Sequence, residues 1–147
     1  MREKTVIVIA DDDEGHVNLI KKNLRRAGIS DEILHFVDGE ETIRFFSEAR
    51  SDIQGLKKTS YLILLDIRMP KIDGIAVLEH LKQDSVLQKI PVIVITTTDD
   101  PREHKKCNDL GCIDYMVKPI EHEKIIQTFE QLGFFSLCKK SPEISGY

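Results

Sequence analysis

The chain has 147 residues, which is enough for one domain of ordinary size with a buried core. It carries 21 Lys and Arg and 25 Asp and Glu, a formal net charge of −4, which argues against a nucleic-acid-binding surface as its main function. The apolar runs are too short to span a membrane, and acidic residues follow the first run before a signal-peptide core could form, so a cytoplasmic protein is expected.

Strand-like and helix-like patterns then alternate along the chain. Residues 5–10 form an apolar, β-branched run that predicts a strand, and apolar positions between residues 17 and 27 recur with helical spacing. Residues 32–37 predict a second strand, followed by a helical pattern at 43–49. Residues 51–60 show weak periodicity, and we interpret them as a longer surface connection.

The second half of the chain repeats this alternation. Three further strands are predicted, at residues 61–65, 91–96 and 113–117. A helical pattern follows each of them, at residues 75–83, 101–110 and 125–132. Residues 1–133 are therefore predicted to be one domain, and residues 134–147 a C-terminal tail that is partly disordered.

Five strands alternating with five helices predict an α/β fold, a doubly wound parallel sheet with helices on both faces. Ligands of such sheets bind beyond the carboxyl ends of the strands, near the point where the strand order reverses. If the order is 2-1-3-4-5, giving a flavodoxin-like, three-layer α/β/α architecture, the first and third strands are neighbours and the reversal lies between them.

Chemically active side chains stand at these strand ends: Asp11 and Asp12 after the first strand, Asp66 after the third, Thr96 at the end of the fourth and Lys118 after the fifth. Two like charges about 4 Å apart repel by ~4 kcal/mol at a surface-like dielectric. Three clustered carboxylates therefore either have raised pKa values or bind a cation, and Mg²⁺ suits their oxygen ligands.

A carboxylate beside a cation, a lysine and a hydroxyl is the arrangement that phosphoryl transfer to an aspartate requires. Asp66 would be the nucleophile, and Lys118 and the metal would each hold phosphoryl oxygens. The hydroxyl of Thr96 could bond the third oxygen only after the phosphoryl group has arrived, which would make it a sensor. No general base is needed, because an ionised carboxylate carries no proton.

Each residue also has a simpler explanation when it is taken alone. Asp13 is interpreted as a helix N-cap, and capping would explain Asp11 and Asp12 as well as metal binding does. Asp66 could begin an ordinary turn, Thr96 could be a strand-end threonine, and Lys118 could lie in a solvated loop. The placement of all of them at successive strand ends favours the functional interpretation.

The sequence blocks IADDDE, LLDIRMPKIDG, IPVIVITTT and DYMVKP occur in an order and spacing that closely resemble the receiver domain of two-component response regulators. The resemblance extends over residues 5–132. It implies that Asp66 accepts a phosphoryl group from a histidine of a sensor kinase. It also implies that Asp12 is a direct Mg²⁺ ligand, that Asp11 acts mainly through water, and that the backbone carbonyl of Arg68 is the third protein ligand.

The resemblance assigns roles to further residues. Thr96 and Tyr115 match a switch hydroxyl and an aromatic ring that moves with it, although Tyr115 alone reads as a half-buried strand aromatic. Lys118 matches the family lysine, and a cis peptide is expected before Pro119. Pro70 and Gly74 match a structural turn after Asp66. The side chain at Arg68 is unusually large, and in the family this position influences dephosphorylation.

Three further features resemble the stand-alone receivers associated with bacterial phytochromes: the longer connection at residues 51–60, the stretch LKQDSVLQKIPVIVITTTDD, and the C-terminal residues from Gly133 onward. A phytochrome-type histidine kinase is therefore a candidate phosphodonor. The residues after the last helix are too few for an output domain, so the signal is expected to pass by protein contact to an unknown downstream partner. Candidate surfaces include the tail residues Phe134, Phe135 and Leu137, which could equally pack back onto the domain. The resemblance also allows a phosphorylation-dependent homodimer.

Two other functions compete with this reading. One is a Mg²⁺-dependent phosphatase that acts through an aspartyl phosphate, but such enzymes carry a second aspartate two residues after the nucleophile, where this chain has Arg68. The other is a scaffold whose acids only cap helices. We therefore expect phosphoryl acceptance and slow self-dephosphorylation rather than enzymatic turnover.

Overall fold

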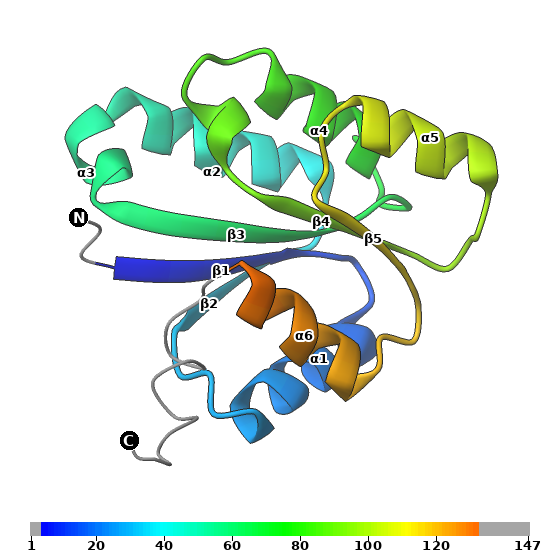
Figure 1. The fold of residues 1–147 in the computed structure, drawn as a ribbon. Helices are drawn as coiled ribbons and strands as arrows, with labels where there is room; N and C mark the ends of the chain where they lie inside the picture. The colour runs from blue at the N-terminus through cyan, green and yellow to red at the C-terminus, as the bar shows by residue number, and fades with distance from the viewer. Residues whose placement is uncertain (1–3, 133–147) are drawn as a thin grey trace.

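The apolar runs form a five-stranded sheet in the computed structural model, which describes residues 4–132 (Figure 1). The strand order is β2-β1-β3-β4-β5, and each neighbouring pair is parallel. The predicted fold class and strand order are therefore confirmed. The strands are β1 (Lys4–Ala10), β2 (Glu32–Phe36), β3 (Thr59–Asp66), β4 (Val92–Thr96) and β5 (Asp114–Val117).

The helices cover both faces of this sheet, with α1 and α6 on one face and α2, α4 and α5 on the other (Figure 1). Within the described residues they are α1 (Glu14–Arg26), α2 (Gly39–Ser51), α3 (Ile53–Lys57), α4 (Gly74–Lys82), the short 3₁₀-helix η1 (Leu87–Lys89), α5 (Pro101–Asp109) and α6 (His122–Gln131).

The central strand β3 explains why its apolar run has no polar interruptions. Leu62 and Leu64 belong to the core beneath α1 and α6, whereas Ile63 and Leu65 belong to the core beneath α2 and α4. All four are at most 3% exposed. A strand that is buried on both faces needs apolar residues at every position.

Aspartates begin most of the helices. Asp13 is the N-cap of α1 and accepts a hydrogen bond of 3.2 Å from the backbone N–H of His16, so the predicted capping role of Asp13 is confirmed. Four more helices have an aspartate in the same role: Asp38, Asp52, Asp73 and Asp100. All of these caps except Asp52 lie in loops that follow a strand, where each marks the start of the next helix.

Residues 51–60, interpreted from the sequence as a longer surface connection, contain a short helix and the start of a strand. Asp52 caps the short helix α3, Leu56 of that helix is 6% exposed in the core, and β3 already begins at Thr59. A helix of five residues makes little more than one turn, so its sequence cannot display the repeated spacing that identifies a longer helix.

The other predicted elements lie where expected: the strand ends agree to within two residues, whereas α1, α2 and α6 begin three or four residues before the first position of their predicted helical patterns. The proposed domain boundary at residue 133 and the tail residues Phe134, Phe135 and Leu137 lie outside the described residues. Within residues 4–132, no helix is long and apolar enough to cross a membrane.

Candidate functional site

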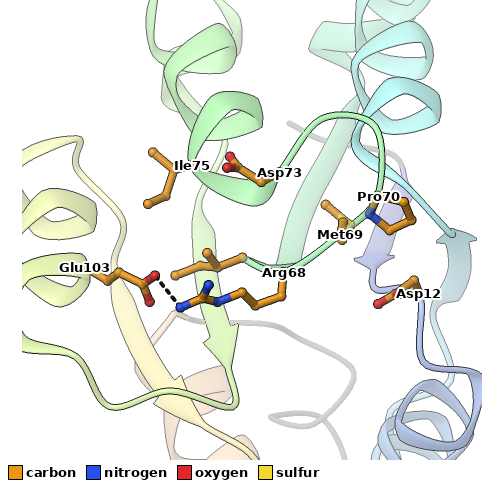
Figure 2. A pocket seen from close by; sticks show the side chains of 8 residues that line it. Asp12, Arg68, Met69, Pro70, Asp73, Ile75 and Glu103 are labelled. Carbon is orange, nitrogen blue, oxygen red and sulfur yellow. Dashed lines mark hydrogen bonds and ion pairs between the residues drawn. The ribbon is translucent and has the colours of Figure 1, made fainter.

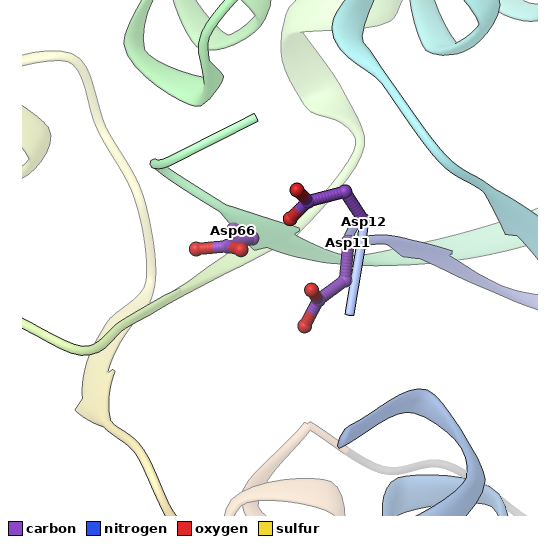
Figure 3. Close-up of side chains that lie close together, drawn as sticks. All are labelled: Asp11, Asp12 and Asp66. Carbon is purple, nitrogen blue, oxygen red and sulfur yellow. The ribbon is translucent and has the colours of Figure 1, made fainter. Parts of the chain in front are cut away.

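The carboxyl ends of β1 and β3 lie side by side, at the point where the strand order reverses. Asp11 and Asp12 directly follow β1, and Asp66 is the last residue of β3. One carboxylate oxygen from each of the three lies within 4.8 Å of the others (Figure 3). The parallel register thus brings together the three acids that the sequence predicted to converge.

The three carboxylates differ in their contact with solvent. Asp11 and Asp66 are 1% and 3% exposed, whereas Asp12 is exposed. Burial of two like charges is unfavourable unless positive charge or hydrogen-bond donors compensate. Two of the carboxylates, those of Asp11 and Asp66, are therefore buried at the bottom of the site, and solvent reaches the site at Asp12.

Lys118 supplies positive charge to the buried pair. Its Nζ lies 3.0 Å from Oδ2 of Asp11 and 3.2 Å from Oδ2 of Asp66, and its side chain is 10% exposed. Three carboxylates and one ammonium leave a formal charge of −2, which matches a divalent cation. The donors are all oxygen atoms and one carboxylate faces solvent, so the residues suit Mg²⁺, which prefers oxygen ligands and retains water.

The two buried acids have opposite pKa shifts. Burial, together with the charge of Asp11, raises the pKa of Asp66 to about 6, while Lys118 opposes the shift. Burial would also raise the pKa of Asp11, but hydrogen bonds from His16, the backbone of Asp13 and Lys118 lower it to about 2. At neutral pH both carboxylates are ionised, and Asp66 is the less stabilised of the two.

Two histidines contact Asp11, and the sequence analysis did not identify either of them. Nδ1 of His16, in the first turn of α1, lies 2.7 Å from Oδ2 of Asp11. Nε2 of His35, on β2, lies 2.7 Å from the backbone carbonyl oxygen of Asp11. The acidic run offers many local partners, so the sequence contains no signal that selects these two rings.

The predicted switch residues Thr96 and Tyr115 both contact Thr98. Oγ1 of Thr96, a fully buried residue, accepts a hydrogen bond of 3.1 Å from the backbone N–H of Thr98. The hydroxyl of Tyr115 donates to the carbonyl of Thr98 at 3.0 Å, and its ring stacks on His104 with centroids 4.4 Å apart. Thr98 therefore joins the two residues, a role that sequence reasoning missed.

The side chain of Arg68 reaches away from the acidic cluster toward α5. Its Nη2 lies 2.8 Å from Oε2 of Glu103 (Figure 2) and 3.5 Å from Oγ1 of Thr98. Arg68 and Glu103 line a pocket of about 500 Å³ that also includes Asp12. The backbone N–H of Arg68 donates to Oδ1 of Asp66 at 3.2 Å, so the Arg68 backbone borders the carboxylates.

The turn after Asp66 is built as the sequence suggested. The backbone N–H of Gly74 donates to the carbonyl of Ile67 at 2.8 Å, and a Cβ at Gly74 would lie 2.2 Å from the carbonyl oxygen of Asp66. Pro70 lies in this turn and lines the same pocket, and the Lys118–Pro119 peptide is cis. Glycine is required at residue 74 because no larger residue could approach the strand end so closely.

Comparisons with known proteins agree with this geometry. A family model for the response regulator receiver domain matches residues 7–130. A response regulator receiver domain from Rhodospirillum rubrum has a similar structure, with 38% sequence identity and a TM-score of 0.64 over 90% of this chain and 94% of that one. The phosphorylated cyanobacterial phytochrome response regulator RcpA has 26% identity and a TM-score of 0.71 over 92% of this chain and 95% of RcpA.

A curated relative, the alkaline phosphatase synthesis transcriptional regulatory protein PhoP of Bacillus subtilis, is 31% identical over 81% of this chain. The match spans 44% of PhoP, so the comparison concerns one part of that longer protein. The family match, by contrast, spans most of the present chain, and the chain therefore belongs to the receiver-domain family of two-component response regulators.

Proposed function

We propose that this chain is a response regulator receiver domain that accepts a phosphoryl group on Asp66 from a histidine of a sensor kinase. The observation that carries the proposal is the contact of Lys118 with both Asp66 and Asp11, inside a cluster of three carboxylates. This arrangement leaves Asp66 ionised at neutral pH beside a positive charge that a phosphoryl group can share.

In the proposed reaction a carboxylate oxygen of Asp66 attacks phosphorus. The O–P bond forms as the P–N bond to the donor histidine breaks, and the electron pair of that bond passes to the imidazole nitrogen. Lys118, already 3.2 Å from Asp66, would neutralise a phosphoryl oxygen. Thr96 would exchange its contact with the backbone of Thr98 for a phosphoryl oxygen.

Mg²⁺ is the proposed cofactor. Asp12, Asp66 and the backbone carbonyl of Arg68 would hold the ion, and Asp11 would act through water. When bound, the ion supplies positive charge that stabilises the phosphoryl oxygens in the transition state.

The signal is proposed to leave the site by protein contact. A movement of Thr96 would disturb Thr98, and through the carbonyl of Thr98 it would disturb Tyr115 and the ring of His104. Such a change biases two conformations that already exist in equilibrium. The protein is proposed to act in the cytoplasm. The phosphorylated form would bind an unidentified downstream protein or a second copy of the chain.

The identity of the kinase is a finer part of the proposal. RcpA is a phytochrome response regulator, and its similarity along 92% of this chain favours a phytochrome-type histidine kinase as the phosphodonor.

We do not propose turnover of a phosphorylated metabolite. The residue two positions after Asp66 is Arg68, whose guanidinium is paired with Glu103, and it offers no carboxylate for general acid–base catalysis.

The proposal is tested by incubating the protein with acetyl phosphate and Mg²⁺ and measuring its intact mass. We expect the wild-type chain and an Asp99→Asn variant, which changes an exposed aspartate, to gain one phosphoryl group. Asp66→Asn should gain none. Equal phosphorylation of the Asp66→Asn variant, or no phosphorylation of the wild type, would contradict the proposal.

A further inference from the structure

The carboxylate of Asp11 is held by three donors from this chain. Its Oδ1 accepts a hydrogen bond of 2.9 Å from the backbone N–H of Asp13. Its Oδ2 lies 2.7 Å from Nδ1 of His16 and 3.0 Å from Nζ of Lys118. An ionised carboxylate has about four acceptor sites, so little capacity remains for other ligands.

The contact between His16 and Asp11 is buried and has a definite direction. The side chains of His16 and Asp11 are 7% and 2% exposed. An ionised carboxylate can only accept a hydrogen bond, so Nδ1 of His16 carries the proton and donates it. The backbone N–H of His16 also donates to Oδ1 of Asp13, so the position of this ring is set both by the start of α1 and by Asp11.

The ammonium group of Lys118 cannot make close contacts with all the acceptor oxygens of the site at once. In this structure its Nζ is divided between Asp11 and Asp66. When the proposed phosphoryl group arrives on Asp66, Lys118 would move toward the new oxygens and weaken its contact with Asp11. A buried carboxylate that loses its partner is strongly unfavourable, unless another donor keeps it paired.

We propose that His16 is a positioning residue for phosphoryl acceptance: it holds the carboxylate of Asp11 in place and paired, so that Asp11 can release Lys118 to the phosphoryl group. The inference rests on the function proposed above and adds a residue outside the set of carboxylates, hydroxyl and lysine. Without His16, Asp11 depends on Lys118 and one backbone N–H, and it retains the lysine that Asp66 needs.

A purely structural role for His16 makes a different prediction. If the ring only packs α1 against the sheet, its replacement lowers the stability of the fold but leaves the chemistry of the folded protein unchanged. If the ring positions Asp11, then restoring a donor at the place of Nδ1 restores the chemistry. Asparagine presents its amide nitrogen close to that place, whereas leucine fills similar space without a donor.

The experiment compares His16→Leu and His16→Asn with the wild type at a temperature where circular dichroism shows each protein to be folded. Phosphorylation by acetyl phosphate is timed at saturating Mg²⁺, and Mg²⁺ binding is measured separately by calorimetry. We expect His16→Leu to be phosphorylated about tenfold more slowly and to bind Mg²⁺ about tenfold more weakly, the usual effect of removing a residue that orients a metal-site carboxylate. His16→Asn should be close to the wild type in both measurements.

His35→Ala is the matched control, because His35 hydrogen-bonds to the backbone carbonyl of Asp11 and its removal leaves the donors to the Asp11 carboxylate in place. This variant should be less stable, with a phosphorylation rate near that of the wild type. A wild-type rate in folded His16→Leu, a slow rate in folded His16→Asn, or equal slowing by His35→Ala would overturn the role of His16. Failure of the wild type to become phosphorylated would overturn the proposed function instead, and the calorimetry would still test His16.

Discussion

The surroundings of Asp66 destabilise its ionised form. It is 3% exposed, it lies within reach of two other carboxylates, and burial together with the charge of Asp11 raises its pKa to about 6. Groups with shifted pKa values in such clusters are characteristic of functional sites. Asp66 thus reduces the stability of the fold at neutral pH, and a bound cation or phosphodonor can reverse that effect.

Asp66→Asn should therefore stabilise the protein in Mg²⁺-free buffer at pH 7. An unfolded aspartate has a pKa near 4, so between about pH 4 and 6 the native state binds more protons and its stability falls as the pH rises. Above pH 6 this loss of stability is complete. We therefore expect the free energy of unfolding of Asp66→Asn to exceed that of the wild type by about 1–2 kcal/mol, a value reduced to allow for screening by solvent near the site. Thermal unfolding at pH 7 and at pH 4 measures the difference.

The gain should be clearly smaller at pH 4 than at pH 7, and Asp99→Asn should show none at either pH. Added Mg²⁺ should raise the melting temperature of the wild type much more than that of Asp66→Asn. If Asp66→Asn were less stable than the wild type at pH 7, the raised pKa of Asp66 would be wrong.

Arg68 and Glu103 provide a second prediction, on the lifetime of the phosphoryl group. Glu103→Gln weakens the hold of α5 on the guanidinium, which can then turn to the phosphoryl oxygens and shield them from water. Arg68→Met removes the cation altogether but keeps the backbone carbonyl. We expect the lifetime to lengthen in the first variant and shorten in the second, each by about two- to fivefold, as for a partly exposed ion pair.

Loss of phosphoryl mass over time after removal of the donor measures these lifetimes. Arg102→Met is the control, because Arg102 lies on the same helix as Glu103 with a side chain that is 93% exposed. Lifetimes that are the same in all four proteins would show that the Arg68 side chain has no part in dephosphorylation.

The turn between β3 and α4 connects Asp66, the proposed phosphoacceptor, to the helical layer. Besides Gly74, it contains Lys71, which has a φ of 67° and pairs through Nζ with Asp38 and Glu40 at 3.6 and 3.4 Å. Asp38 and Glu40 lie at the start of α2, so this turn also contacts the neighbouring loop. The turn is therefore tied to the end of β3 at Gly74 and to the start of α2 at Lys71.

Gly74→Ala should disrupt this element, because a Cβ would lie 2.2 Å from the carbonyl oxygen of Asp66. Backbone atoms cannot yield as a flexible side chain can, so we expect a loss of about 2–4 kcal/mol in the free energy of unfolding, together with weaker Mg²⁺ binding. Gly15→Ala, in the first turn of α1, would contact only the side chain of Asp13 at 3.3 Å and should be neutral or slightly stabilising. Urea unfolding of both variants makes the comparison, and equal losses would contradict the assigned role of Gly74.

At the scale of the molecule, residues 4–132 form two apolar cores separated by one sheet. Neighbouring residues of β3 point into different cores, and both cores reach the sheet edge where the carboxylates gather. A rigid sheet with filled cores on both faces keeps strand ends in fixed relative positions, which a site made from four separate strands requires.

Leu64→Ala and Leu65→Ala should for this reason have similar effects. Their side chains face opposite cores and are 3% and 0% exposed, so each truncation should lower the free energy of unfolding by about 2–5 kcal/mol. Val117→Ala, at a 39% exposed position of the edge strand β5, should cost less than about 1 kcal/mol. Denaturant unfolding tests this, and a negligible loss from either leucine variant would be inconsistent with two filled cores.

Much of this architecture could be predicted from the sequence. Uninterrupted apolar runs such as residues 61–65 identify buried strands, and the alternation with helical patterns limits the topology to a doubly wound sheet. The same alternation placed Asp11, Asp12, Asp66 and Lys118 at one edge. The short helix α3 was missed, because a single turn held by the Asp52 cap and Leu56 leaves no repeating pattern.

The ends of the strands were enough to predict which residues gather, since all parallel strands present their carboxyl ends at one edge of the sheet. The partners within the cluster came from the folded structure: His16 on Asp11, Thr98 between Thr96 and Tyr115, and Glu103, which lies 35 residues from Arg68. Strand and helix patterns depend on local spacing, which a sequence displays directly. Contacts between side chains of different elements depend on register and rotamer, which are set only when the layers pack together.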